Sequence, residues 1–76
     1  MTVQELNQAN KTKAPVIWRG RHDYETTIGS VTAVISRYSE NGEVISAEVT
    51  SFRSPRNVII CRPEDLHPWA PANQNS

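Results

Sequence analysis

The feature that most constrains this chain is a pair of alternating, β-branched runs joined by Asn41-Gly42. The first run covers residues 30–38 and the second covers residues 43–52. Asn-Gly supplies adjacent residues that tolerate a positive φ, which a tight type I′ turn requires. The sequence therefore predicts a long β-hairpin within a small, mainly β fold, which leaves little room for a catalytic scaffold.

A tight turn at 41–42 fixes a predicted register for this hairpin. Because side chains alternate across a strand, residues that lie opposite one another share a face. The predicted core face carries an apolar row from the two strands: Tyr38, Ile45, Val34 and Val49. On the other face, Val31 is expected opposite Phe52. A bulged loop would shift the register and exchange the faces.

Three further segments complete the predicted sheet. Residues 14–19 read as a first strand, and residues 57–62 read as a short strand that is apolar enough to be central. Residues 63–69 begin with Pro63 and predict a single helical or 3-10 turn that anchors Leu66 in the core. We therefore expect a single small antiparallel β-barrel or strongly curled sheet of about five strands, with one short 3-10 turn near the C-terminus.

The two ends of the chain carry few apolar side chains. Residues 1–13 predict a flexible segment, with a frayed helix as the alternative, and residues 70–76 predict a disordered tail. The expected domain, residues 14–69, contains about 55 residues, near the size at which one core barely outweighs the conformational entropy of the chain. A homo-oligomer is therefore a possible state.

Composition and charge limit the classes of function. Eight Lys plus Arg residues balance eight Asp plus Glu residues, whereas non-specific nucleic-acid binders usually carry a basic excess. The lone Cys61 fits a reducing compartment. The sequence shows no signal-peptide pattern and no apolar run of membrane-spanning length. We therefore expect a cytoplasmic protein that does not enter a membrane.

Candidate chemistry for an enzyme is sparse. Cys61 with His22 or His67 has the residue types of a nucleophile and base, but a cysteine in an apolar strand usually behaves as a small hydrophobic residue. No paired Cys or His motif suits a metal, and the chain has no glycine-rich phosphate loop. The sequence predicts no catalytic residues, no metal and no cofactor.

Aromatic and basic residues form the candidate binding surface. They are Trp18, Arg19, Arg21, His22, Tyr24, Arg53, Arg56 and Trp69. Aromatic rings offer a stacking surface to bases or proline-rich peptides, and arginines bind phosphates or carboxylates. The alternative is that Trp18 completes the core and Trp69 covers one end of the sheet. We predict a non-enzymatic binding, adaptor or regulatory accessory module with a protein or nucleic-acid partner.

The order of the predicted elements resembles that of the small Src-homology-3-like barrels. The resemblance is carried by Gly29-Ser30-Val31, by the hairpin and by residues 58–66. Such barrels include modules of ribosomal and transcription proteins and the plasmid-type dihydrofolate reductases. Those reductases line a tetrameric pore with Val-Gln-Ile-Tyr, whereas Val58-Ile59-Ile60-Cys61 lacks the Gln and the Tyr. The resemblance implies the fold and, as an alternative function, a small oligomeric enzyme with its site between subunits.

Overall fold

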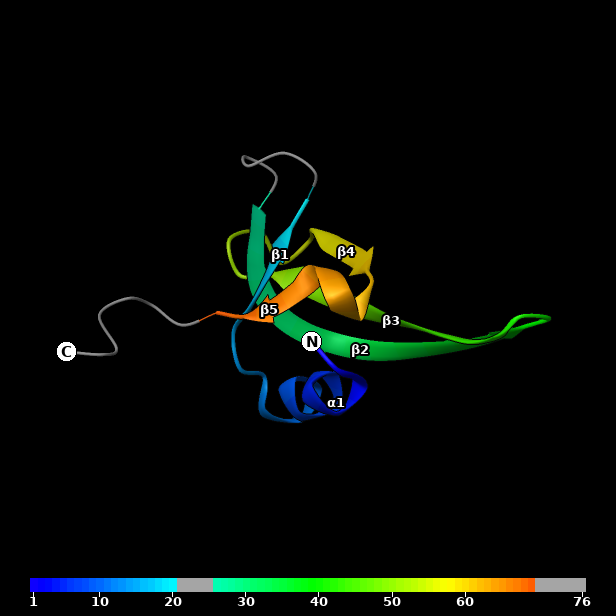
Figure 1. Cartoon of the computed structure of the whole chain (residues 1–76). Helices are drawn as coiled ribbons and strands as arrows, with labels where there is room; N and C mark the ends of the chain where they lie inside the picture. Colours follow the sequence, from blue (N-terminus) through cyan, green and yellow to red (C-terminus); the bar gives the residue numbers. More distant parts are fainter. Residues whose placement is uncertain (21–25, 70–76) are drawn as a thin grey trace.

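One five-stranded antiparallel sheet organises the computed structural model, which describes residues 1–20 and 26–69 (Figure 1). Its strands are β1 (Val16–Arg19), β2 (Thr26–Ser39), β3 (Gly42–Ser51), β4 (Val58–Cys61) and β5 (Leu66–Pro68). The spatial order is β4-β3-β2-β1-β5. The predicted mainly β class is confirmed. The sheet is curled rather than closed, because β4 and β5 do not pair with each other in the described part of the chain.

The two edges of the sheet are formed by the shortest elements of the C-terminal third. The 3-10 turn η1 (Pro63–Asp65) links β4 to β5, as the sequence predicts, and Leu66 is fully buried after it. The prediction that residues 57–62 form a central strand is wrong, since β4 pairs with β3 alone and ends the sheet. Val58 and Ile60 are 47% and 58% exposed, so the apolar density of this strand shows neither burial on both faces nor a second neighbouring strand.

The register of the β2–β3 hairpin differs from the predicted one. Tyr38 lies opposite Glu43 rather than Ile45, because residues 40–41 form the turn and Gly42, at a φ of 112°, follows it. This is a shift by an even number of residues. Each side chain near the turn therefore stays on its predicted face.

A β-bulge then changes the faces further along β2. Val31 lies opposite Val49, but the next ladder pair on the turn side begins at Ala33, so that Thr32 is an extra residue. An extra residue of this kind makes the side chains beyond it point to the opposite face of the sheet from the one expected. Val31 therefore points to the core, and the prediction that it lies opposite Phe52 on the other face is wrong.

At Gly29 the backbone of β3 leaves no room for a side chain on β2. A Cβ atom at this position would lie 2.0 Å from the carbonyl oxygen of Thr50. Backbone cannot give way as a side chain can, so only glycine fits here. This contact brings the start of β2 onto the end of β3.

An N-terminal helix, α1 (Val3–Thr12), stands where the sequence predicts a flexible segment. A capping box starts it: Thr2 Oγ1 accepts from the backbone N–H of Glu5 at 3.1 Å, and Glu5 Oε1 accepts from that of Thr2 at 2.8 Å. Leu6 and Ala9 are buried against the sheet. Packing of this kind, rather than intrinsic propensity, stabilises short helices.

Both ends of α1 are bonded to the sheet. The ammonium group of Met1 donates to the carbonyl oxygens of Pro63 at 2.7 Å and Leu66 at 2.9 Å. At the other end, Lys13 adopts a φ of 59° and donates from Nζ to the carbonyl oxygen of Val31 at 3.0 Å. The helix therefore connects η1 and β5 with the bulge of β2.

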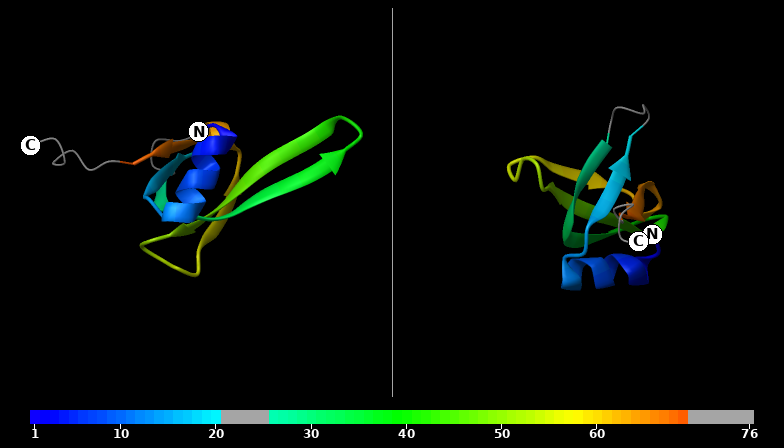
Figure 2. Two further views of the ribbon diagram at one scale, coloured as in Figure 1. Left: turned by 90° about the horizontal axis from the view of Figure 1, so that it is seen from below. Right: turned by 90° about the vertical axis from the view of Figure 1, so that its left-hand side faces the viewer.

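The core lies between α1 and the concave face of the sheet (Figure 2). Its buried residues come from nearly every element: Leu6, Ala9, Val16, Val31, Ala47, Val49, Cys61 and Leu66. Val34 and Ile45 are half-buried at its margin. These few side chains hold together segments that lie far apart in the sequence.

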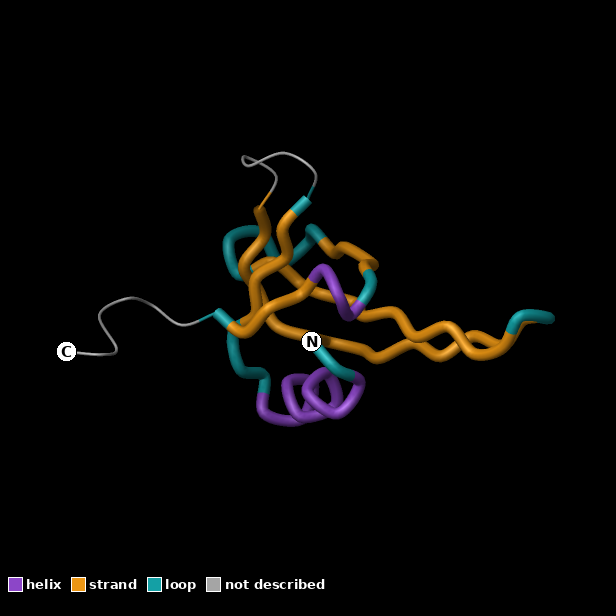
Figure 3. The backbone as a smooth tube through the Cα atoms, viewed as in Figure 1, coloured by secondary structure: helices purple, strands orange, loops and turns teal. Residues whose placement is uncertain are grey.

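The turn end of the β2–β3 hairpin extends from this core as an arm (Figures 1 and 3). Tyr38 near its tip shares the face of Val34 and Ile45 but is 81% exposed, so the prediction that it belongs to the core is wrong. The molecule measures 47 × 24 × 21 Å along its principal axes. The hairpin therefore extends well beyond the core that covers its base.

Candidate functional site

Among the described residues, the predicted aromatic and basic side chains do not all lie on one surface. Arg19 is exposed at the end of β1, and Arg53 and Arg56 are exposed in the turn between β3 and β4. Trp69 lies at the opposite end of β1, where its N–H donates to the carbonyl oxygen of Pro15 at 3.1 Å. Four residues of extended chain, about 13 Å, separate Pro15 from Arg19. Trp69 therefore stands apart from Arg19.

Of the remaining predicted residues, one packs at the core and three lie outside the described part of the chain. Trp18 is half-buried and packs against the core cluster, which is the structural role that the sequence left open for it. Arg21, His22 and Tyr24 lie outside the described residues. Arg19, Arg53 and Arg56 therefore remain as exposed candidates for binding an anion.

A groove lies between the start of β2 and the turn after β3. Its volume is about 350 Å³, and it is lined by Thr26, Thr27, Ile28, Ser51, Phe52, Arg53, Ser54 and Asn57. Most of these side chains carry hydroxyl, amide or guanidinium groups, and none of the described lining residues is acidic. Arg19 pairs with Thr26 across the β1–β2 ladder and so lies beside this groove.

The turn that forms one wall of the groove is held by its own hydrogen bonds. The N–H of Phe52 donates to the carbonyl oxygen of Ile28 at 3.0 Å. Ser51 Oγ accepts from the N–H groups of Arg53 at 3.2 Å and Ser54 at 3.3 Å. These bonds fix the backbone from which Phe52 and Arg53 project. Such preorganisation lowers the entropic cost of binding.

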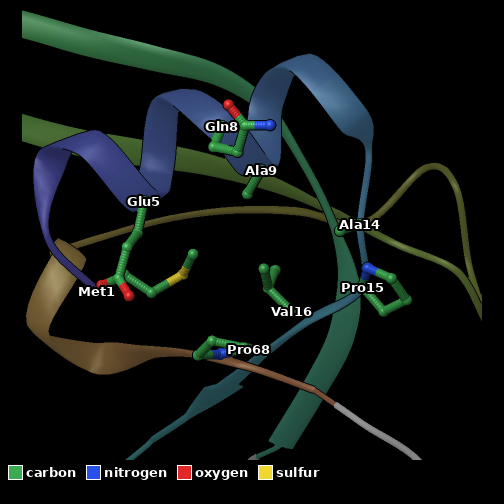
Figure 4. A pocket seen from close by; sticks show the side chains of 8 residues that line it. All are labelled: Met1, Glu5, Gln8, Ala9, Ala14, Pro15, Val16 and Pro68. Carbon is green, nitrogen blue, oxygen red and sulfur yellow. The ribbon is translucent and has the colours of Figure 1, made fainter.

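A second cavity, of about 210 Å³, opens beside α1 and is apolar (Figure 4). It is lined by Met1, Glu5, Gln8, Ala9, Ala14, Pro15, Val16 and Pro68. The thioether of Met1 lies opposite Val16 and Pro68 across this space. Sequence reasoning missed the cavity because it predicted a flexible segment at residues 1–13, with only a frayed helix as the alternative. The Thr2-to-Glu5 capping box is the signal that could have revealed the helix.

Cys61 lies in the core and is nearly inaccessible. Burial, with a smaller contribution from the negative charge of Asp65, raises the pKa of its thiol to about 11. The thiol is therefore protonated at neutral pH, whereas a nucleophilic cysteine needs a thiolate. The described residues contain no group of three His, Cys, Asp or Glu side chains placed to hold a metal ion.

Comparison with known proteins adds no identification. No protein-family model, no curated protein and no solved structure matches this chain. Within the described residues, no helix has the length and apolar character needed to cross a membrane. What the protein can bind must therefore be argued from its own geometry.

Proposed function

We propose that this protein is a non-enzymatic binding module that holds a single-stranded nucleic-acid segment in the groove between the start of β2 and residues 52–57. The observation that carries the proposal is the lining of this groove. It combines hydrogen-bonding side chains with Arg53, and none of its described residues is acidic. An anionic, hydrogen-bonding chain is the ligand that such a lining suits.

Each part of the groove has a role in this proposal. The guanidinium groups of Arg53 and Arg56 pair with phosphates, and Arg19 at the end of β1 extends the same surface. The exposed ring of Phe52 offers a stacking face to an unpaired base. A formal net charge of zero means that these local arginines, rather than the field of the whole protein, supply the attraction.

The experiment is a fluorescence-anisotropy titration of a short single-stranded oligonucleotide at two salt concentrations. Two phosphate contacts predict that affinity falls about sevenfold between about 50 mM and about 200 mM salt. The double variant Arg53→Ala/Arg56→Ala should remove most of this dependence. Arg37→Ala is the matched control, because Arg37 is exposed on the arm and away from the groove. Equal losses in both variants would refute the groove.

A protein partner is the second candidate function, and the apolar cavity beside α1 favours it. A volume of about 210 Å³ suits one aliphatic or proline side chain of an extended segment. Affinity for such a partner should change little with salt and should fall for Ala14→Asp, which puts a charge in the cavity. The two candidates therefore differ in how strongly the affinity for the partner depends on salt.

The enzyme alternative suggested by the reductase-like layout stays a separate hypothesis. A native mass spectrum showing a stoichiometric oligomer that carries a discrete small-molecule mass would favour it. We place the proposed binding role in the cytoplasm, since a chain whose one cysteine is a free thiol suits a reducing compartment.

A further inference from the structure

The two ends of strand β3 lead into segments of opposite charge. The acidic tip, residues 38–43, contains Glu40 and Glu43 and no basic residue. The arginine turn, residues 52–57, contains Arg53 and Arg56 and no acidic residue. All four charged side chains are exposed. A chain with a formal net charge of zero therefore has one negative and one positive end.

The geometry of β3 keeps these two ends apart within one molecule. The ten residues of β3 span about 30 Å, at about 3.3 Å per residue. The strand is paired on both sides, with β2 and with β4, so it cannot fold back on itself. Figure 1 shows the tip and the turn in opposite directions from the sheet. This separation is about three Debye lengths at about 0.1 M salt, so neither end neutralises the other.

The charges at both ends are also without a local partner among the described residues. The ion pair that these residues do form joins Arg62 to Glu64 at the start of η1. Glu43 accepts a hydrogen bond from the hydroxyl group of Ser36. That bond orients the carboxylate of Glu43 and leaves its charge in place. Each end therefore offers an oriented, unneutralised charge to another molecule.

The face of the sheet between the two ends carries exposed aliphatic side chains. Helix α1 packs on the concave face (Figure 2). On the outer face, Val44 is 55% exposed, Val58 is 47% exposed and Ile60 is 58% exposed. Val44 and Ile60 line the same shallow hollow, of about 290 Å³. Removing such apolar surface from water would stabilise a complex that covers this face.

We propose that two copies of this chain form a closed dimer through their outer faces, with the acidic tip of each copy on the arginine turn of the other. The two copies run antiparallel about a two-fold axis near the middle of β3. Because the tip and the turn have the same separation in both copies, one arrangement makes both contacts at once. A two-fold pair of this kind uses the same surface twice and leaves no end open for further growth.

Two further charges of the outer face fit this arrangement. Arg37 lies opposite Val44, and Glu48 lies four residues further along β3 on the same face. With the axis near Ser46, Arg37 of each copy lies over the segment that carries the partner's Glu48. A parallel arrangement would instead place tip on tip and Arg37 near the partner's Arg37. Like charges placed together in an interface are unfavourable, so charge selects the antiparallel pair.

The size of this face limits the strength of the dimer. Three strands spaced about 5 Å apart and about 30 Å long present roughly 400 Å² per partner. A standard protein interface buries about 800 Å² per partner. The charged contacts are exposed, so salt screens them. We therefore expect a reversible dimer that forms at high protein concentration and weakens as salt is added.

Sedimentation velocity over a concentration series, at about 50 mM salt and without nucleic acid, tests the dimer. We expect a monomer–dimer equilibrium for the unaltered chain and an at least tenfold weaker dimer for Glu40→Gln/Glu43→Gln. Glu64→Gln/Asp65→Asn is the matched control, because it makes the same change in net charge in η1 and should leave the dimer unchanged. Circular dichroism checks that both variants are folded. A monomer throughout the series, species larger than a dimer, or equal weakening by both variants would overturn the proposal.

A mixture of two charge-reversed chains tests the contact between tip and turn. Glu40→Arg/Glu43→Arg has two positive ends and Arg53→Glu/Arg56→Glu has two negative ends, so each should be monomeric alone. An equimolar mixture should form a dimer, because each tip then meets a turn of opposite charge. If the mixture stays monomeric, the tip does not contact the turn.

This inference does not rest on the binding of nucleic acid. Self-association is measured without an oligonucleotide, and Glu40 and Glu43 do not line the groove. A chain that dimerises without binding an oligonucleotide, or that binds one as a monomer, would separate the two proposals.

Discussion

The base and the tip of the β2–β3 hairpin have the same alternating sequence pattern and opposite environments. At the base, Val31 and Val49 face each other and are fully buried. At the tip, Tyr38 and Val44 are largely exposed. What differs is the cover, because α1, β1 and β5 pack at the base alone (Figure 2). The alternation of a strand specifies its pairing, and its neighbours decide which side chains are buried.

Substitution of glycine should give the largest contrast between base and tip. At the base, Gly29→Ala places a Cβ 2.0 Å from the Thr50 carbonyl oxygen, and we expect a loss of more than about 4 kcal/mol of stability. At the tip, Gly42→Ala meets no atom within 4 Å and should cost about 1 kcal/mol through its positive φ. Urea unfolding measures both. Similar losses would mean that the close approach at Gly29 relaxes freely.

Weakening the packing of α1 on the base of the hairpin should have the next largest effect on stability. Leu6→Ala deletes a fully buried side chain of α1 and should destabilise the protein by about 3 kcal/mol. Val3→Ala is the matched control, since Val3 is exposed on the same helix and should change stability by less than about 0.5 kcal/mol. If the two variants unfold at the same urea concentration, α1 does not cover the base.

Alkaline pH should lower the stability of the fold at the base of the β2–β3 hairpin through ionisation of Cys61. The pKa of its thiol is raised from 9.0 to about 11 by burial. The unfolded chain therefore loses the proton first, and stability present below pH 9 decreases as the pH rises toward 11. The expected loss is about 2 kcal/mol. Thermal unfolding of Cys61→Ala over this range is the control, and it should lack this part of the decrease.

The smallest expected effect concerns the start of α1. Thr2→Ala removes one half of the capping box and should cost about 1 kcal/mol. The backbone hydrogen bond from Thr2 lowers the pKa of Glu5, so the separate contribution of the Glu5 carboxylate to the capping box is present above the usual pKa of the carboxyl group. It is lost as the pH falls through the lowered value. Helicity of Glu5→Gln, followed by circular dichroism, should not show this acid transition.

The sequence predicted the strands and the mainly β class better than it predicted their burial. Asn41-Gly42 indicated the hairpin, but the turn lies at 40–41 because Ser39 already pairs with Gly42. The bulge at Thr32 carries no sequence signal. Its hydroxyl lies 2.7 Å from Glu48 Oε2 and 3.1 Å from Thr50 Oγ1, contacts that exist only after the strands pair.

The candidate sites were less predictable because they join distant segments. The groove needs both residues 26–28 and residues 51–57, and the apolar cavity needs α1 beside Pro68. The exposure of Arg53 and Arg56 followed from their turn, whereas Trp18 had two readings that only packing could separate. The edge position of β4 was hidden by a sequence typical of an inner strand.

The extra residue in β2 also determines where this chain can tolerate a change in length. Because of the bulge, the residues of the base that face the core are set independently of the residues that share that face along the arm. Adding or deleting one residue between Arg37 and Tyr38 would resize the loop at the tip and leave Val34 against the core and Val31 opposite Val49. The arm is thus a natural insertion point for a tag or a recognition peptide.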